Sequence, residues 1–175
     1  MIAIRTLLTL TLLLGVGYPL AVTGLAQLMF PWQANGSQLT NGKQQLIGSA
    51  LLAQKFERAE YFHSRPSASD FATLGGGASN LGMSSPLRAE FAKAEAKVQG
   101  GDPSPTLLTR SASGLDPHLP LDAVQAQVER IAKRRGLDPA ALTERVQSGA
   151  QAGILGPRVV NILQLNLWLD KDKDA

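Results

Sequence analysis

The sequence predicts an α+β protein in which a single N-terminal transmembrane helix precedes one exported α+β domain with a small sheet and about three helices. Three observations support this fold class. No acidic, basic or histidine residue occurs from Thr6 to Gly42, helix signals recur between residues 85 and 149, and leucines alternate with other residues near the C-terminus. We expect residues 1–30 to form the anchor and residues 31–175 to form the exported domain.

The apolar segment from Leu7 to Phe30 is long enough to cross a membrane, since a spanning helix needs about 20 residues at a rise of about 1.5 Å each. Arg5 and the free amino group are the only charges that flank it on the N-terminal side. Because positively charged flanks stay in the cytoplasm, we expect a cytoplasmic N-terminus and export of the chain from Pro31 onward. A cleaved signal peptide is the alternative, since residues 24–26 offer small side chains after a short apolar run.

A long irregular segment is predicted in the first part of the exported domain. The stretch from Leu46 to Phe56 is apolar but does not distinguish a strand from a helix. The stretch from Glu57 to Ser85 contains Pro66 and three consecutive glycines at residues 75–77, which favour a loop. Long loops in compact domains are commonly functional or disordered. We therefore expect a partner-binding surface in this segment.

The first helix of the exported domain is predicted to open at Ser85 and Pro86, because serine is a good N-cap and proline suits the first helical turn. Apolar residues then recur on one face as far as Val98, and Gly100-Gly101 are expected to end the helix. A short strand is expected over residues 106–109.

Two further helices are predicted after Pro120. One runs from Leu121 to Arg135 with apolar residues at helical spacing, and Gly136 supplies its C-terminal stop. The other spans residues 138–148 and starts at an Asp-Pro pair. Leu137 and Leu142 are placed to close a hydrophobic staple over this start.

The chain is predicted to finish with a strand. Four leucines occur at every second position, which is the period of a strand with one buried face. They are Leu163, Leu165, Leu167 and Leu169.

The composition excludes several function classes. The chain has no cysteine, so it can form neither a disulfide framework nor a thiol site. Its net charge is +3 with both signs interspersed, and no basic run is coupled to aromatic residues as in a nucleic-acid interface. The one basic cluster, at residues 133–135, ends a predicted helix, where cations interact favourably with the helix dipole. A structural role is favoured for it over an anion site.

No catalytic or metal-binding motif is apparent. His63 and His118 are the only histidines and lie far apart in the sequence, without metal-ligand spacing. Ser113, Asp116 and His118 are close together but lack the G-x-S-x-G motif of α/β-hydrolases. The glycine-rich segment is not followed by the Gly-Lys-Ser/Thr of a phosphate-binding loop. These absences favour an accessory subunit, and the alternative is a membrane-anchored exported hydrolase that uses Ser113 and His118.

Six short strings, in the same order and over almost the whole chain, closely resemble the C subunit of the Kdp potassium-transporting ATPase. They are FPWQANGS at 30–37, GSALLAQKF at 48–56, YFHSRPSA at 61–68, ASNL at 78–81, SASGLDPH at 111–118 and VVNILQLNL at 159–167. Several positions depart from the family pattern. Arg110 stands where a small residue is usual, Thr106 where an acid is common, and Trp168 where an alanine is usual; Met83 and Ser85 also vary, and the stretch from Glu95 to Pro105 is short.

The resemblance implies a single-pass protein of the bacterial inner membrane with a retained anchor and a periplasmic domain. Its partners would be a channel-like potassium-binding subunit and a P-type ATPase subunit, and the chain itself would be noncatalytic but needed for their assembly and activity. The family is described as a catalytic chaperone that raises the ATP affinity of the ATPase subunit. ATP binding is therefore implied by family attribution only, with no residue assigned, and the expected topology opposes it because ATP is cytoplasmic.

The strings shared with this family lie largely in predicted loops and carry several polar residues. We expect these residues to form the surface that docks on the channel-like subunit, although polar residues in such loops are as often simple turn formers. The expected docking residues are Tyr61, His63, Arg65, Asn80, Asp116 and Asn161.

Overall fold

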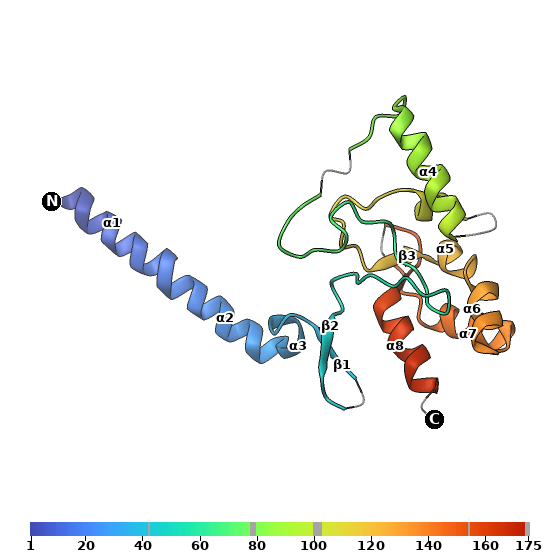
Figure 1. Ribbon diagram of the computed structural model, residues 1–175. Helices are drawn as coiled ribbons and strands as arrows, with labels where there is room; N and C mark the ends of the chain where they lie inside the picture. Colours follow the sequence, from blue (N-terminus) through green and yellow to red (C-terminus); the bar gives the residue numbers. More distant parts are fainter. Residues whose placement is uncertain (42, 78–79, 100–102, 154, 174–175) are drawn as a thin grey trace. The chain divides into compact units, whose positions relative to one another are not determined.

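The computed structural model describes residues 1–41, 43–77, 80–99, 103–153 and 155–173. The chain divides into two compact units, Met1–Ser49 and Ala50–Ala175. Each unit is described separately, and the course of the chain in both can be followed in Figure 1.

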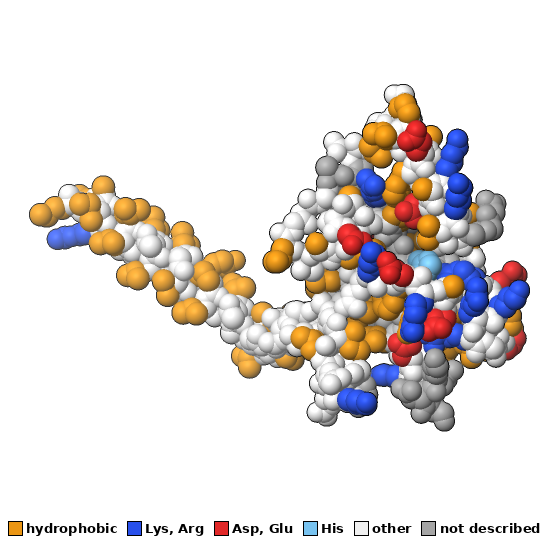
Figure 2. All heavy atoms as spheres, in the orientation of Figure 1, with side chains coloured by type: hydrophobic (Ala, Val, Ile, Leu, Met, Phe, Trp, Pro, Cys, Tyr) orange, Lys and Arg blue, Asp and Glu red, His pale blue; other side chains and the backbone are white. Residues whose placement is uncertain are grey.

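The first unit begins with one continuous apolar helix. It consists of α1 (Ile2–Leu12), a π-helical turn η1 (Leu13–Gly17) and α2 (Tyr18–Met29). None of its residues is buried, and Figure 2 shows apolar side chains along its whole length. It has 28 residues and is the one helix in the described part of the chain that is long and apolar enough to cross a membrane. Its length and composition fit a membrane anchor.

A short helix and a hairpin complete the first unit. Helix α3 (Pro31–Ala34) leads into β1 (Gln38–Thr40), which pairs antiparallel with β2 (Leu46–Ser49). The turn between α3 and β1 uses left-handed backbone at Gly36, with φ of 81°. The ambiguous apolar stretch that begins at Leu46 is therefore a strand up to Ser49.

The second unit confirms the α+β class. Strands β3 (His118–Pro120) and β4 (Val159–Asn161) pair antiparallel. The described structure thus holds two two-stranded sheets, one in each unit, rather than a single small sheet. Four helices follow or flank the second sheet: α5 (Leu121–Gln125), α6 (Val128–Arg135), α7 (Pro139–Ser148) and α8 (Ile162–Lys173).

The core of the second unit lies among these four helices and the second sheet. It is apolar and almost completely excluded from water, as expected for the part of the chain that drives folding. Its largest members are Phe62, Leu107, Leu119, Val124, Ile131, Leu142, Val146, Ile162, Leu165 and Leu169.

The predicted helix starts and stops are confirmed where the structure describes them. Helix α4 occupies Pro86–Gln99, and the predicted stop at Gly100-Gly101 lies outside the described residues. Gly136 ends α6 with a left-handed φ of 69°. The Asp138 carboxylate accepts the N–H groups of Ala140 and Ala141 at the start of α7. The single helix predicted from residue 121 to 135 is interrupted after α5 and resumes as α6.

Two predicted strands were wrong. The alternating leucines near the C-terminus lie in α8, where Leu165 and Leu169 are buried one turn apart on the helix. Over a short stretch, residues spaced by two and by four can all be apolar in either a strand or a helix, so the leucine pattern fits both. The helix is favoured by Asn161, whose side chain accepts the N–H of Gln164 and caps the start of α8. The strand expected over residues 106–109 is instead a 3₁₀ helix, η2 (Pro105–Leu108).

Candidate subunit-docking site

The loop predicted as a partner surface is partly buried, and two side-chain amides hold its backbone. Asn166 of α8, which has no exposed surface, accepts the N–H of Phe62 and donates to its carbonyl, both at 2.9 Å. Gln127 does the same for His63, at 2.8 and 3.1 Å. Each side-chain amide thus forms two hydrogen bonds to the backbone of one loop residue, as a neighbouring strand would. These bonds satisfy N–H and C=O groups that would otherwise be buried without a partner.

Arginines of α6 hold the loop from the side. Arg130 donates to the carbonyls of Ala59 and Tyr61, the latter at 3.1 Å. Arg135 donates to the carbonyl of Glu60 at 2.8 Å and to the Asp170 carboxylate at 3.1 Å. The basic cluster at the end of α6 therefore includes a cation with a structural role, as the sequence indicated.

Tyr61, the first predicted docking residue, is buried in this arrangement. Its hydroxyl donates to Asp170 and accepts from Arg58, both at 2.8 Å. The guanidinium of Arg135 lies 4.8 Å from the centre of its ring, close enough for a cation–π interaction.

His63, the second, is buried beside Arg130. Burial lowers the pKa of His63 below its ordinary value, and the positive charge of Arg130 lowers it further. The Arg58 carbonyl, 3.3 Å from Nε2, and the Gln99 side chain act in the opposite direction. The net shift favours a neutral imidazole, which suits a ring enclosed by protein better than a charged one.

The structure brings Arg65 and Asp116 together. Their side chains form an ion pair at 3.7 Å, and both are partly exposed. Arg65 also donates to the carbonyl of Arg110 at 2.8 Å, while Asp116 accepts the N–H of His118 at 3.0 Å. The pair therefore joins the loop around residue 65 to the segment before β3.

Asn161, another predicted docking residue, also forms hydrogen bonds within the second unit, whereas none is found for Asn80 among the described residues. The Asn161 amide donates to the carbonyl of Ala50 at 2.7 Å and lies 3.5 Å from Nε2 of His118. Asn80 is exposed, and within the described residues no recorded contact joins it to the other five. Five of the six predicted residues thus share one trait, which is hydrogen bonding within the unit.

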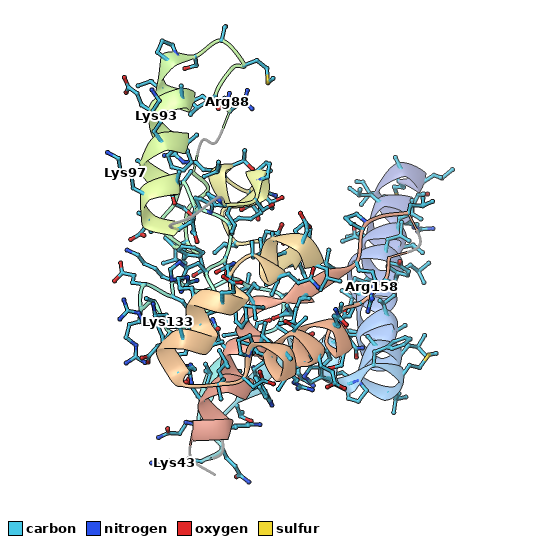
Figure 3. The ribbon with its side chains drawn as sticks, turned by 90° about the vertical axis from the view of Figure 1, so that its right-hand side faces the viewer. Lys43, Arg88, Lys93, Lys97, Lys133 and Arg158 are labelled. Carbon is cyan, nitrogen blue, oxygen red and sulfur yellow. The ribbon has the colours of Figure 1, made fainter. Side chains whose placement is uncertain are left out.

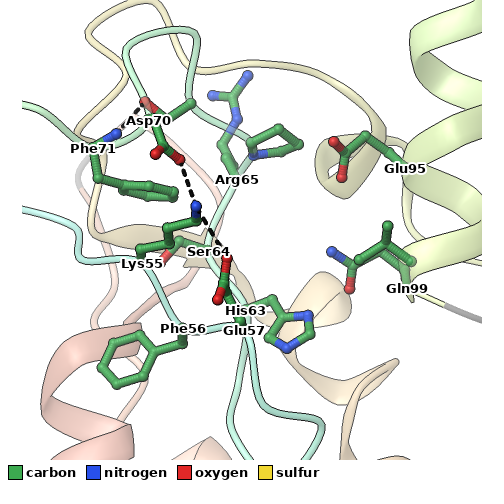
Figure 4. Close-up of a pocket in the computed structure, with 13 residues that line it drawn as sticks. Lys55, Phe56, Glu57, His63, Ser64, Arg65, Asp70, Phe71, Glu95 and Gln99 are labelled. Carbon is green, nitrogen blue, oxygen red and sulfur yellow. Dashed lines mark hydrogen bonds and ion pairs between the residues drawn. The ribbon is translucent and has the colours of Figure 1, made fainter.

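An open cleft of about 410 Å³ lies between the loop and α4 (Figure 4). On the loop side, the Lys55 amine bridges Glu57 at 3.0 Å and Asp70 at 2.9 Å. Glu95 and Gln99 extend toward the cleft from α4. Of the predicted docking residues, His63 and Arg65 line it.

The α4 side of the cleft offers hydrogen-bond acceptors. Burial raises the pKa of Glu95 above its ordinary value, and the nearby charge of Arg110 opposes this shift. The Gln99 Oε1 atom is buried and meets no donor at hydrogen-bond geometry in the described structure, although the Gln99 side chain is near enough to His63 to raise the pKa of that residue.

The cleft residues on α4 were missed in the sequence. Glu95 and Gln99 are four residues apart and so share a helix face, but spacing does not reveal which face meets the loop. Two apolar side chains of α4 are more than half exposed: Val98, which lines the cleft, and Leu87, near the start of the helix. Figure 3 shows Lys93 and Lys97 extending to the same side as Lys133 of α6.

The metal-binding and hydrolase alternatives can be compared with the positions of the described residues. Among them, no group of three or more histidines and acids could hold a metal ion. The Ser113 hydroxyl accepts the N–H of Leu115 at 3.1 Å, while the His118 ring faces Asn161. No hydrogen bond between Ser113 and His118 is found in this part of the chain, so the hydrolase alternative gains no geometric support.

Comparison with known proteins matches residues 1–171 to a family model described as KdpC: K+-transporting ATPase, c chain. A protein of Pseudomonas aeruginosa PAO1 named potassium-transporting ATPase KdpC subunit is 48% identical over 171 residues, which cover 95% of this chain and 93% of that protein. A protein of the same name from Pseudomonas putida F1 is 46% identical over 173 residues, covering 97% and 94%. A third, from Pseudomonas syringae pv. tomato DC3000, is 44% identical over 174 residues, covering 97% and 91%.

Proposed function

Because the chain belongs to the KdpC family of K+-transporting ATPase subunits, we propose that it is a noncatalytic accessory subunit needed for the assembly and activity of a Kdp-type complex. Its partners in this proposal are a channel-like potassium-binding subunit and a P-type ATPase subunit. The observation that carries the proposal is the family match from residue 1 to residue 171, which takes in the apolar helix as well as the unit from Ala50 onward.

The proposed topology is a single pass of the bacterial inner membrane with a cytoplasmic N-terminus and a periplasmic domain. Arg5 supports this orientation as the one charged side chain before the apolar stretch. Phe30 and Trp32 are exposed at the end of the helix, where aromatic side chains favour a membrane interface. The family match includes residues 1–30, which supports a retained anchor over a cleaved signal peptide.

The proposed docking surface for the channel-like subunit is the cleft together with the loop and α4 that border it. In this proposal Asn80 contributes by direct contact, since it is exposed. Tyr61, His63, Arg65, Asp116 and Asn161 contribute mainly by holding the loop in shape, as their internal bonds indicate. The Glu95 and Gln99 side chains, which line the cleft from α4, are the polar groups that such a surface would offer from that helix.

The rise in ATP affinity that the family resemblance implies is assigned to the ATPase subunit. A periplasmic domain has no direct access to cytoplasmic ATP, so such an effect would pass through contacts with the partner subunits. We therefore assign no ATP contact to any residue of this chain.

Deletion of the gene tests the role in transport. We expect potassium uptake at micromolar external potassium to be lost, and expression of the full-length chain to restore it. Affinity purification of the tagged chain in mild detergent, after growth in low potassium, is expected to recover both partner subunits. Recovery of the chain alone, from membranes that contain both partners, would contradict the proposal.

A further inference from the structure

The chain turns sharply where the apolar helix ends. Helix α2 ends at Met29, and Phe30 leaves helical geometry with φ of −138° and ψ of 56°. The next residue is Pro31, and a proline disfavours helical backbone at the residue before it. Helix α3 starts there and packs beside the end of α2 (Figure 1). We call the stretch from Gln27 to Asn35 the corner.

Two side-chain amides fasten the corner from either side of this turn. Asn35 Nδ2 donates to Gln27 Oε1 at 3.1 Å, and Gln27 Nε2 donates to Asn35 Oδ1 at 3.4 Å, so the two amides pair in both directions. Asn35 Nδ2 also donates to the Pro31 carbonyl at 2.7 Å. In a continuous helix, residues eight apart would be separated by about 12 Å along the axis. The pairing instead brings Asn35 back beside the last turn of α2.

The length of the apolar helix puts the corner at one boundary of the membrane. A hydrocarbon core of about 30 Å takes up about 20 residues at a rise of about 1.5 Å each. Counted from Thr6, the first residue after the charge of Arg5, the core is filled near Leu25. Gln27 then lies about 3 Å beyond the core, inside a headgroup layer that is about 5 to 7 Å thick. Because Asn35 pairs with Gln27, the same count puts the end of α3 in that layer.

The corner exposes an uncharged, apolar surface. Its exposed apolar side chains, each about half exposed or more, are Leu28, Met29, Phe30 and Trp32. The indole N–H of Trp32 donates to the Gln38 carbonyl at 3.2 Å, so the polar edge of the ring has a partner. Aromatic side chains are enriched at the membrane interface. Because this surface continues that of the spanning helix without a charged side chain, phospholipid is the cover that it suits.

We propose that the corner binds phospholipids of the periplasmic leaflet, with α3 lying in the headgroup layer and the rings of Phe30 and Trp32 inserted among the lipids. The Gln27–Asn35 amide pair holds α3 at this depth. The inference rests on the proposed function, since it needs a membrane-spanning anchor and a periplasmic domain. It goes beyond that function because the chain then leaves the membrane after α3, near Asn35, and not at the end of the apolar helix.

The fluorescence of Trp32 tests the depth of α3. Trp168→Phe leaves Trp32 as the only tryptophan of the full-length chain. In phosphatidylcholine vesicles, we expect lipids brominated high in the acyl chain to quench Trp32 about twofold more than lipids brominated near the chain end. Equal or weaker quenching by the shallow bromines, or no quenching by either, would overturn the inference. Resistance to alkaline carbonate extraction separates the two proposals, since release of the chain would refute the anchor itself.

Gln27→Leu tests the amide pair, because leucine removes the tie to Asn35 and makes the helix more apolar. Weaker membrane insertion therefore does not explain a change. We expect the quenching of Trp32 by shallow bromines to fall about twofold as α3 leaves the headgroups. The matched control is Gln45→Leu, which makes the same exchange at an exposed residue and breaks the Asn41–Gln45 amide pair of the hairpin, at 2.9 Å. Equal quenching in the two variants would contradict the role of the Gln27–Asn35 pair.

The assembled complex shows whether lipid or a partner subunit covers the corner. A phospholipid with a photoactivatable group in its upper acyl chain is expected to attach to residues 28–32 on illumination, as located by mass spectrometry. Attachment to the chain alone in vesicles, but not to the chain in the complex, would mean that a partner subunit covers this surface. That result would contradict the inference.

Discussion

The apolar helix and the unit from Ala50 onward differ in what covers their side chains. No residue of Ile2–Met29 is buried, and the helix exposes apolar side chains along its whole length. In the second unit, buried Asn166 and Gln127 pair the loop backbone within the same chain. The second unit therefore satisfies much of its buried backbone with its own side chains, whereas the apolar helix needs a membrane or a partner to cover its side chains. Changes to internal pairing should therefore alter stability, and changes to the helix should alter insertion and assembly.

Asn166→Ala is expected to have the largest effect, because it breaks the self-sufficiency of the second unit. It leaves the N–H and the carbonyl of Phe62 buried and unpaired, at about 1 to 3 kcal/mol each, so we expect a loss near 4 kcal/mol in the free energy of unfolding. Urea unfolding of the purified chain in mild detergent measures this, with Trp168 beside the core as the fluorescent reporter. The control is Gln164→Ala on the exposed side of α8. A change below 1 kcal/mol for Asn166→Ala would show that water replaces the amide.

Val16→Arg tests the dependence of the helix on lipid. An arginine at the centre of a spanning helix costs about 3 kcal/mol in insertion. We expect most of the chain to lose resistance to alkaline carbonate extraction. Gln164→Arg, which adds the same charge to an exposed position of the second unit, should leave extraction unchanged. Full retention of the Val16→Arg chain would indicate that this part of the helix faces water or a polar partner.

The sequence predicted the elements whose signals are local. The N-cap at Asp138 and the glycine stop at Gly136 act within a few residues, so both could be read directly. The C-terminal strand failed because helix and strand periods overlap over a short run of leucines. The pairing of Phe62 by Asn166 spans 104 residues of sequence, and no local pattern encodes which amide meets which loop.

Less of the candidate site could be predicted, because it is formed by residues that lie far apart in the sequence and meet only on folding. The sequence placed a partner surface in the loop that borders the cleft, but the α4 residues that complete it depend on how the helix packs. Arg65 and Asp116 were singled out separately, and only folding brings them within 3.7 Å. Their assignment to docking remains a prediction.

Arg65→Ala and Asp116→Ala distinguish docking from internal bracing. Because this pair is partly exposed, a double-mutant cycle should give a coupling of about 1 kcal/mol or less in stability. If the braced loop docks on the channel-like subunit, either variant should nevertheless reduce co-purification of that subunit severalfold. An intact complex after removal of both side chains would exclude these two residues from the docking surface. The matched reference is Arg158→Ala, which removes an exposed arginine near α7.

His63 gives the smallest expected effect, through the pH dependence of stability. Its pKa is lowered in the folded state, so as the pH falls below the ordinary histidine value the unfolded chain takes up a proton before the folded chain does. The contribution of His63 to the free energy of unfolding is therefore constant above the ordinary histidine pKa. It decreases as the pH falls from that value toward the lowered pKa of the folded state. His63→Gln should flatten the corresponding part of the stability profile measured by urea unfolding between neutral and mildly acidic pH. An unchanged slope would mean that His63 takes up its proton at the same pH in the folded and the unfolded chain, and the ring would then be more accessible to water than its burial indicates.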